Sequence, residues 1–270
     1  DRTNNLRTRL INDLNFSSFD FINKNGVKNN INFYFKNLIT SEKKNEKYHA
    51  SPTWDLNGIM EIQSNLPLIK NGENFIDYLT PKISLRINPS NDMKDYSDDD
   101  RRIDTENLFN IDRLGLDDAL EPGNNLTLGI DYKREKIEDI NKYFELKLGT
   151  VFREKDNDQI PSTSTLSQKN SNYFGLIRNN FNENFSLDYQ FSVDNDFSTF
   201  EYSSLGTTFS YNSFETTFRF IEEHGKIGGS NIIENKKTFA LNDKNYFSFK
   251  TRENREIDLT EYYDLIYEYK

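Results

Sequence analysis

The sequence contains no cysteine among its 270 residues. This excludes a disulfide framework and any thiolate metal site within these residues. Histidine is nearly as scarce, since His49 and His224 are the only two, and neither has a second ligand nearby at metal-binding spacing. We therefore expect both histidines to be solvated loop residues, and we expect no metal site and no cofactor.

Long hydrophobic runs are also missing. A membrane-spanning helix needs about 18–20 consecutive apolar residues, whereas the longest runs here, such as Tyr173–Phe174 and Leu176–Ile177, are a few residues long. No transmembrane helix is predicted. The chain opens at Asp1 without a methionine or a leader pattern and ends at Lys270 inside a strand-like pattern, so we expect it to be a fragment.

Positive charge is in deficit. There are 34 Lys and Arg residues against 44 Asp and Glu residues, which gives a net charge of −10. Nucleic acid is therefore excluded as an expected partner, because its phosphates require a basic surface. Hydrophobic residues make up 34%, too few for a conventional core, yet 14% of residues are aromatic, which excludes the disordered class.

Patterns typical of catalysis are absent as well. There is no Gly-x-Ser-x-Gly motif, and Gly225–Ser230 lacks the Gly-Lys-Ser/Thr ending of a phosphate-binding loop. The acidic run Asp98–Asp100 lacks the glycine and distal glutamate of a calcium loop, so we interpret it as a solvated charge run. We therefore expect no enzyme.

What the sequence does contain is strict alternation of apolar and polar residues. In Phe185–Val193 every odd position is apolar and every even position is polar, which predicts a strand with one apolar and one polar face. Further strands are expected in residues 125–132, 144–152, 214–220 and 263–269. Less regular strands are expected near Leu6–Phe21, Asn30–Thr40, Thr53–Leu68, Phe75–Ile87, Tyr173–Arg178, Phe200–Tyr211, Ile233–Leu241 and Tyr246–Arg252.

The expected connections lengthen at every second position. The long ones are Ser41–Ala50, Pro89–Gly123, Arg153–Asn172 and Glu222–Asn231, all on one side of the alternation, while Lys133–Asn141 is of medium length. Short turns at one end and long loops at the other are typical of outer-membrane barrels. We predict one all-β domain over residues 1–270, an antiparallel meander of about 12–13 strands that forms part of a large transmembrane barrel. A soluble barrel or sandwich would show the same alternation, so that alternative stays open.

The polar positions of these strands are candidates for lining a wet lumen. We expect Leu187→Arg to prevent membrane assembly and Asp188→Leu to be tolerated, because lipid would meet only the apolar face. The predicted lumen-lining residues are Glu145, Lys147, Asp188, Gln190, Glu215 and Arg219.

The connection Pro89–Gly123 is far longer than the ~2–6 residues typical of compact domains. It holds eleven acidic and four basic residues and thus most of the net negative charge. We expect it to close the barrel from outside or to fold into it, as a lid with charged walls.

Within and after this loop stand nine residues of a spaced motif: Asn107, Leu108, Phe109, Arg113, Gly115, Asp117, Gly123, Gly129 and Tyr132. This motif resembles one of the lipopolysaccharide-assembly outer-membrane protein family, LptD. The flanking pieces Leu66–Leu68, Leu79–Lys82 and Ile87–Pro89, and later Phe247–Arg252 and Glu261–Tyr269, are similar to the same family. Asp118 and Asn125 stand where the family usually has arginine, which is a departure from its pattern.

The resemblance implies a non-enzymatic translocon in the outer membrane of a Gram-negative bacterium, which inserts lipopolysaccharide into the outer leaflet. It implies lipopolysaccharide, outer-membrane lipid, an LptE-like plug lipoprotein and periplasmic lipopolysaccharide-bridge proteins as partners. The alternatives are a porin-like channel for small solutes and a soluble β-rich binding module.

Overall fold

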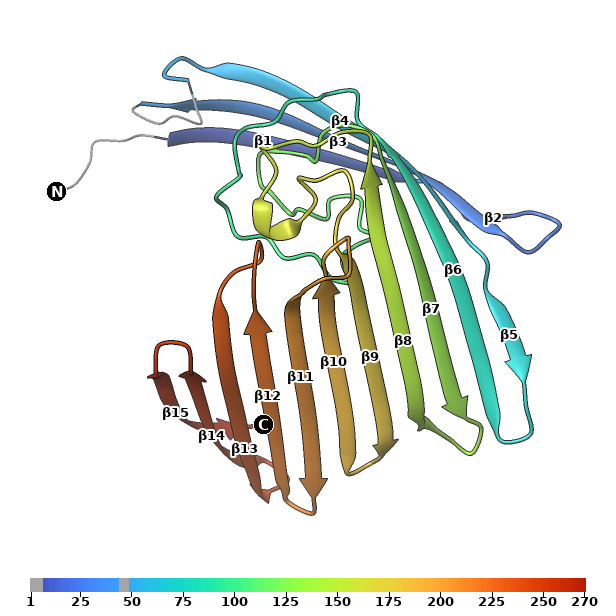
Figure 1. Ribbon diagram of the computed structural model, residues 1–270, viewed down its shortest axis with the longest axis vertical. Helices are drawn as coiled ribbons and strands as arrows, with labels where there is room; N and C mark the ends of the chain where they lie inside the picture. The colour runs from blue at the N-terminus through green and yellow to red at the C-terminus, as the bar shows by residue number, and fades with distance from the viewer. Residues whose placement is uncertain (1–6, 44–48) are drawn as a thin grey trace. The chain divides into compact units, whose positions relative to one another are not determined.

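The computed structural model describes residues 7–43 and 49–270, so Leu6, at the start of the first predicted strand, lies outside the described residues. The described residues form an antiparallel sheet of fifteen strands with one short 3-10 turn, η1, at Ser162–Ser164 (Figure 1). The strands are β1 (Arg7–Ser17), β2 (Phe21–Ile22), β3 (Lys28–Glu42), β4 (Thr53–Asn65), β5 (Leu68–Asn71), β6 (Phe75–Ile87), β7 (Asn125–Lys136), β8 (Asp139–Arg153), β9 (Tyr173–Asn182), β10 (Phe185–Val193), β11 (Phe200–Tyr211), β12 (Phe214–Glu223), β13 (Ser230–Asn242), β14 (Asn245–Asn254) and β15 (Leu259–Tyr269).

The sheet is a meander in which strands follow one another in chain order. Thirteen strands form the continuous path from β1 to β15, while the short β2 pairs with β3 and the short β5 pairs with β6. β1 and β15 are the two edge strands of this path. The predicted fold class, an antiparallel meander of about 12–13 strands, is confirmed.

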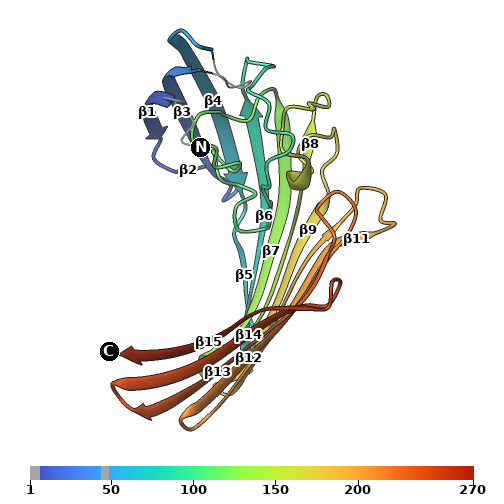
Figure 2. The ribbon, with the colours of Figure 1, turned by 90° about the vertical axis from the view of Figure 1, so that its left-hand side faces the viewer.

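The chain divides into two compact units. Of the described residues, those within 1–67, 81–128 and 150–171 form unit 1, and those within 68–80, 129–149 and 172–270 form unit 2. In unit 1, β1, β3 and β4 lie side by side (Figure 2), with β3 paired to both neighbours along most of its length. In unit 2, β9 to β15 follow one another in order.

Each unit shows the alternation that the sequence predicts. In β6 of unit 1, Ile83 and Leu85 are 42% and 41% exposed, whereas Ser84 and Arg86, which point to the other face, are fully buried. In β11 and β12 of unit 2, Leu205 and Phe218 are likewise exposed on one face. Successive side chains of a strand point to opposite faces, so polar and apolar residues sort onto the two sides of the sheet. The apolar side is the more exposed one, which is the reverse of a water-soluble sandwich.

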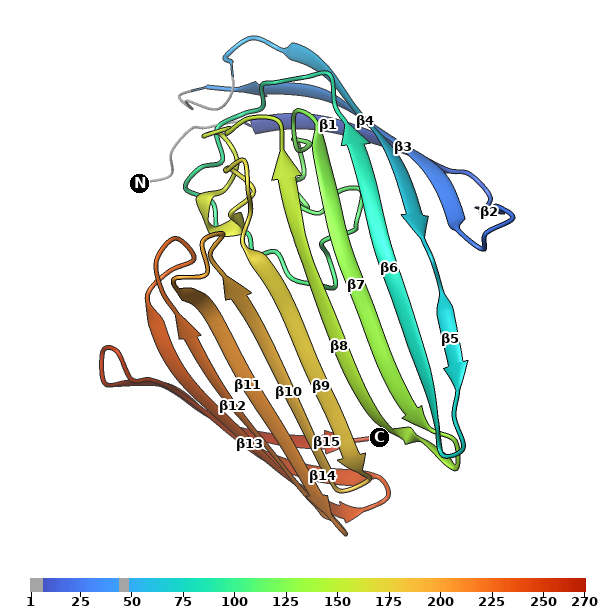
Figure 3. The ribbon, with the colours of Figure 1, turned by 45° about the vertical axis from the view of Figure 1, so that its right-hand side comes forward.

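The turn lengths also alternate as predicted. In unit 2, the turns at residues 137–138, 183–184 and 212–213 are two residues long and lie at one end of the strands (Figure 3). The connections at residues 194–199 and 224–229 lie at the other end. The medium-length connection expected at Lys133–Asn141 is wrong, because β7 extends to Lys136 and β8 begins at Asp139, which leaves a turn of two residues. The connections at the two ends of the strands therefore differ in length more clearly than the sequence predicts.

A glycine on the apolar face of unit 2 makes room for an aromatic ring. Gly175 of β9 is directly opposite Phe191 of β10, and a Cβ atom built on Gly175 would overlap the ring of Phe191. The ring therefore lies flat across the neighbouring strand, an arrangement that covers the glycine with apolar surface.

We expect Gly175→Val to destabilise the protein by about 1–3 kcal/mol, because Phe191 has to leave its position over the strand. Urea unfolding followed by circular dichroism measures this loss. The double variant Gly175→Val with Phe191→Ala should recover part of the stability, since the overlap is gone. Equal losses in the single and double variants would contradict this account of the pair.

Among the described residues, no helix has the length and apolar character needed to cross a membrane.

Candidate functional site

The loop at residues 88–124 is held against the polar face of unit 1. Its two ends meet where the Gly123 N–H donates to the Ser90 carbonyl at 2.8 Å and Asn88 Nδ2 donates to the Glu121 carbonyl at 2.9 Å. Gly123 has a φ of +76°, a conformation that glycine adopts without strain. These two hydrogen bonds join the start of the loop, just after β6, to its end, just before β7.

Between these joined ends, the loop has an apolar core of its own. It packs on the second long loop, at residues 154–172, where Ile160 and Leu166 are fully buried. Tyr96 N–H donates to the Gln159 carbonyl at 2.9 Å, which ties the two loops together. The buried apolar residues of the first loop are Tyr96, Ile103, Leu108, Leu114, Leu116, Ala119 and Leu120.

The centre of the site is the carboxylate of Glu121, which is 3% exposed. Arg113 donates two parallel hydrogen bonds to this carboxylate, Nε to Oε2 at 2.7 Å and Nη2 to Oε1 at 2.6 Å. Arg86 of β6 donates to Oε2 at 3.0 Å, and Arg153 at the end of β8 donates to Oε1. Asn125 of β7 donates to Oε1 at 3.1 Å. One carboxylate therefore binds three arginines and an amide from three strands and the loop.

A second buried acid, Glu61 of β4, extends this arrangement. Arg86 Nε donates to Glu61 Oε1 at 3.2 Å, so Arg86 bridges the two carboxylates. Ser84 and Asn32 also donate to Glu61, at 2.7 Å and 3.1 Å. We call Glu61, Arg86, Arg113, Glu121 and Arg153 the Arg–Glu network.

The Arg–Glu network shifts the pKa of Glu121. Burial alone would raise that pKa, but the charges of Arg113, Arg153 and Arg86, together with the hydrogen bonds from Arg113, outweigh burial and lower the pKa from 4.5 to about 2. Glu121 therefore stays ionised well into the acid range. Because its pKa is lower in the folded state, the stability that it contributes is complete above its ordinary pKa and is lost as the pH falls through the folded value.

We expect the docked loop to loosen only under strong acid. A spin label at position 98, introduced as Asp98→Cys, should stay slow in motion above pH 4.5 and become fast as the pH falls to about 2. Electron paramagnetic resonance measures that motion. In a Glu121→Gln variant, the change in spin-label motion between pH 4.5 and about 2 should be absent. If the change persists in that variant, a group other than Glu121 causes it.

A lysine from β3 fixes the next part of the loop. Lys36 is 2% exposed, and its Nζ donates to the carbonyls of Leu116 and Asp117 at 3.2 Å and 2.9 Å. Gly115, just before them, has a φ of +58°, which turns these carbonyls toward the strand. Nearby, burial raises the pKa of Asp112.

Most of the motif residues lie in this site. Arg113 donates two hydrogen bonds to Glu121, and Leu108 is buried in the loop core. The carbonyl of Phe109 accepts a hydrogen bond from Gln63 of β4 at 2.7 Å, and the Asn107 side chain donates to the Arg102 carbonyl at 3.2 Å. The side chain of Asp117 is exposed and lies 3.5 Å from Arg9, so its backbone does the anchoring.

Gly129 and Tyr132 lie farther along β7, in unit 2. There the Tyr132 hydroxyl donates to Asp77 at 2.7 Å. Of the two positions where arginine was expected by resemblance, Asn125 joins the Arg–Glu network, and Asp118 is buried and accepts a hydrogen bond from Tyr96. Both side chains therefore have hydrogen-bond partners here, although neither position holds the arginine that is usual in the family.

Sequence reasoning missed several residues of this site: Lys36, Glu61, Arg86, Glu121 and Arg153. A usable signal was present at Arg86, since it stands on the polar face of a strand whose other face is lined by Ile83, Leu85 and Ile87. An arginine that is inward-facing and buried requires a buried partner.

The six predicted lumen-lining residues all lie on the polar face of unit 2. A row of directly opposed charges crosses this face, which we call the charge ladder: Glu145, Arg178, Asp188, Arg219, Glu234 and Arg252, with Gly206 between Asp188 and Arg219. Glu145 lies 3.1 Å from Arg178 and 3.2 Å from Lys147, and Glu234 lies 2.9 Å from Arg252. Gln190 and Glu215 share the face by strand parity. Sequence reasoning missed Arg178, Glu234 and Arg252, because which charges oppose one another depends on strand register.

Gly206 allows the ladder to continue across β11. The Asp188 carboxylate leans over Gly206 and reaches to 3.7 Å from Arg219. Opposed charges across strands are favourable, while like charges would not be.

No cluster of three His, Cys, Asp or Glu side chains that could hold a metal ion occurs in residues 7–43 and 49–270. Asp98 and Asp100 are exposed, and His224 pairs with Glu222 at 3.2 Å. The Arg–Glu network fixes the loop in unit 1, and the charge ladder gives unit 2 a charge-balanced polar face.

The chain matches a known family. Residues 37–231, more than two thirds of the chain, match the family described as LptD, LPS transport system D. This range contains the loop, the Arg–Glu network and most of the charge ladder, while the similar segments Phe247–Arg252 and Glu261–Tyr269 lie outside it. No curated protein sequence matches the chain. The chain belongs to the LptD family, a family of outer-membrane proteins that act in lipopolysaccharide transport in Gram-negative bacteria.

Proposed function

We propose that this chain forms part of the barrel wall of an outer-membrane translocon that inserts lipopolysaccharide into the outer leaflet. The observation that carries this proposal is the long loop fixed by the Arg–Glu network on the polar face of a sheet whose apolar face is exposed. A lipid-facing apolar surface is what an outer-membrane strand requires. The family match supplies the substrate class.

Such a role needs no bond chemistry. The polar face would give the sugar head group a wet path, while acyl chains stay near lipid. Glu145, Lys147, Asp188, Gln190, Glu215 and Arg219 would line that path. Lipopolysaccharide would arrive from periplasmic bridge proteins, and an LptE-like plug lipoprotein would occupy the interior.

Deleting residues 107–118 in the intact gene product tests this function. The deletion removes Arg113 and the carbonyls that bind Lys36, so we expect surface lipopolysaccharide to fall sharply. Surface labelling of newly made lipopolysaccharide measures it. In a porin-like channel the same deletion should leave small-solute conductance and surface lipopolysaccharide unchanged, and that result would overturn the proposal.

Lys36→Met is the milder companion variant. It removes two hydrogen bonds to the loop without shortening the chain. We expect the folded barrel to assemble, as judged by its heat-modifiable migration on gels, while lipopolysaccharide delivery decreases. The soluble binding module is tested separately with the unsubstituted full-length product, which as a soluble module would not partition into detergent.

A further inference from the structure

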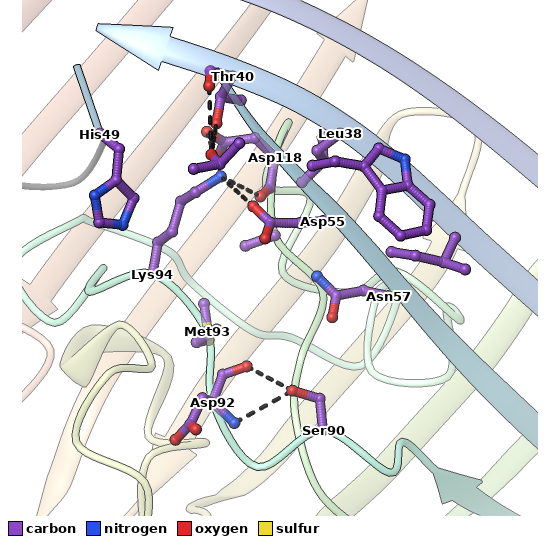
Figure 4. Close-up of a pocket in the computed structure, with 14 residues that line it drawn as sticks. Leu38, Thr40, His49, Asp55, Asn57, Ser90, Asp92, Met93, Lys94 and Asp118 are labelled. Carbon is purple, nitrogen blue, oxygen red and sulfur yellow. Dashed lines mark hydrogen bonds and ion pairs between the residues drawn. The ribbon is translucent and has the colours of Figure 1, made fainter. Parts of the chain in front are cut away.

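Charges on the polar faces of the two units are balanced by their neighbours. In unit 1, a cavity beside β4 is lined in part by Lys94, whose Nζ lies 3.9 Å from Asp55 and 3.7 Å from Asp118 (Figure 4). In unit 2, the charge ladder alternates acids with arginines. Lys237 of β13 differs, because it forms no ion pair with any residue that the structure describes.

Lys237 also lies on the opposite face of the sheet, the apolar face of unit 2. It is opposite Thr216 of β12 and Phe249 of β14, whose ring is exposed. The preceding residue, Lys236, is opposite Lys250 and belongs to the polar face. Strand parity places no other basic residue on the apolar face of β10 to β14, all of which the structure describes. Lys237 is therefore a single positive charge on the face that we expect lipid to meet.

The position of Lys237 along β13 indicates which side of the membrane it serves. It is the sixth residue from the short-turn end at Asn242 and the eighth from Ser230. Short turns lie on the periplasmic side of outer-membrane barrels. A lysine stem lies along apolar surface, here that of the exposed Phe239, while its ammonium reaches toward polar groups. Because an unpaired ammonium is costly in hydrocarbon, we expect it to meet an anion near the periplasmic boundary.

A second hydrogen-bond donor lies directly across from Lys237. Asn235 Nδ2 donates to Thr216 Oγ1 at 3.3 Å and to the Thr217 carbonyl at 3.0 Å. Because Thr216 Oγ1 accepts this bond, its own O–H is left to donate to another group. Side chains directly opposite in a sheet have Cβ atoms about 4.5–5.5 Å apart. The Thr216 hydroxyl and the Lys237 ammonium are therefore close enough to bind two oxygens of one phosphate.

We propose that Lys237 and Thr216 bind the phosphate of an anionic phospholipid from the periplasmic leaflet. The acyl chains of this lipid lie against the exposed rings of Phe218 and Phe249. A lipid with a net negative charge is favoured, because Lys237 has no carboxylate partner and a zwitterionic choline lipid brings a cation of its own. The inference rests on the proposed function only in that the apolar face of unit 2 meets lipid.

Site-specific photocrosslinking in the intact protein tests this site. Benzoylphenylalanine replaces either Phe249, opposite Lys237, or Tyr189, which is opposite Leu205 on the apolar face of β10. Each replaced residue is the fifth from a short turn, so the two probes are matched in depth. The protein is placed in vesicles of equal parts phosphatidylglycerol and phosphatidylcholine with the same acyl chains. We expect the ratio of captured phosphatidylglycerol to phosphatidylcholine, measured by mass spectrometry, to be several-fold higher at position 249 than at position 189.

Three variants assign the preference to Lys237. Lys237→Gln should lower the ratio at position 249 to that at position 189, whereas Lys237→Arg should keep it high. Lys236→Gln is the matched control, because it removes the same charge from the neighbouring residue on the polar face and should leave the ratio unchanged. Heat-modifiable migration confirms that each variant is folded. Equal ratios at the two positions, a ratio unaffected by Lys237→Gln, or capture of a protein instead of lipid at position 249 would overturn the proposal.

The same experiment separates this site from the proposed function. Lipid captured at both positions in equal ratios would leave the apolar face against lipid and would overturn only the phospholipid site. Absence of captured lipid at both positions would contradict the placement of this sheet in a barrel wall, and the site with it.

Discussion

Glu121→Gln is expected to cost about 3–5 kcal/mol of stability, because breaking a buried ion pair leaves the remaining charges without compensation. Arg86, Arg113 and Arg153 all converge on this one carboxylate. Glutamine keeps the size of the side chain but removes its charge and turns an N–H group toward at least two arginine donors. The loop at residues 88–124 should then detach. Urea unfolding measures the loss, and limited proteolysis reports the loop.

Asp98→Asn is the matched control, since Asp98 is an exposed acid of the same loop. It should change stability by well under 1 kcal/mol. Arg113→Met, alone and combined with Glu121→Gln, completes a double-mutant cycle in which the combined loss should be smaller than the sum of the single losses. Additive losses, or a Glu121→Gln variant as stable as Asp98→Asn, would show that the Arg–Glu network does not hold the loop.

The second large effect concerns the faces of the sheet in unit 2. Phe218 and Thr217 are neighbours near the middle of β12, on the apolar and the polar face respectively. We expect Phe218→Arg to destabilise the protein by about 2–4 kcal/mol, the cost of arginine facing lipid at mid-depth. Thr217→Arg places the same charge at the same depth on the polar side, where water is available, and should cost far less.

The yield of folded, membrane-inserted protein measures both variants. The pair isolates the face, because size, charge and depth are shared. Leu187→Arg, expected from the sequence alone to prevent membrane assembly, is a weaker form of the same test, since Leu187 is the third residue of β10 and lies close to a turn, where the cost falls to about 0–1 kcal/mol. Equal yields for Phe218→Arg and Thr217→Arg would contradict the assignment of the two faces.

The strands were predictable because their signal is local. The alternation in Phe185–Val193 fixes which side chains share a face, and the pairing of β10 with both neighbours is regular from Ser186 to Ser192. The family was predictable from a few residues of the loop, and the match over residues 37–231 confirms it. Gly115 and Gly123, both part of that motif, occupy positive-φ turns that other residues adopt less readily.

The Arg–Glu network was not predictable in the same way. Glu61, Arg86 and Arg153 lie in three different strands, and their meeting depends on strand register and on how the loop folds back. The loop itself was expected to be a lid with charged walls, from its eleven acids. The structure adds that its leucines form a buried core and that Asp118 and Glu121 are buried acids with partners. A count of charges cannot distinguish a solvated acid from a paired one.

The charge ladder shows the same limit. Sequence pattern placed Glu145, Asp188 and Arg219 on one face, and they do lie there. Their partners Arg178 and Glu234 were not identified, because pairing requires the register of each neighbouring strand. The ladder leaves this surface nearly neutral, although the whole chain carries a net charge of −10.

The central claim is that lipid meets the apolar face and water meets the polar face of one sheet. These 270 residues contain no cysteine, so a single cysteine introduced along β10 to β12 is the only spin-label site within them. In the intact protein reconstituted in lipid, labels at Leu205 and Phe218 should be reached by oxygen, and labels at Asp188 and Arg219 by a water-soluble nickel reagent. Loss of this alternation, with both faces open to the nickel reagent or the apolar positions closed to both, would contradict the account.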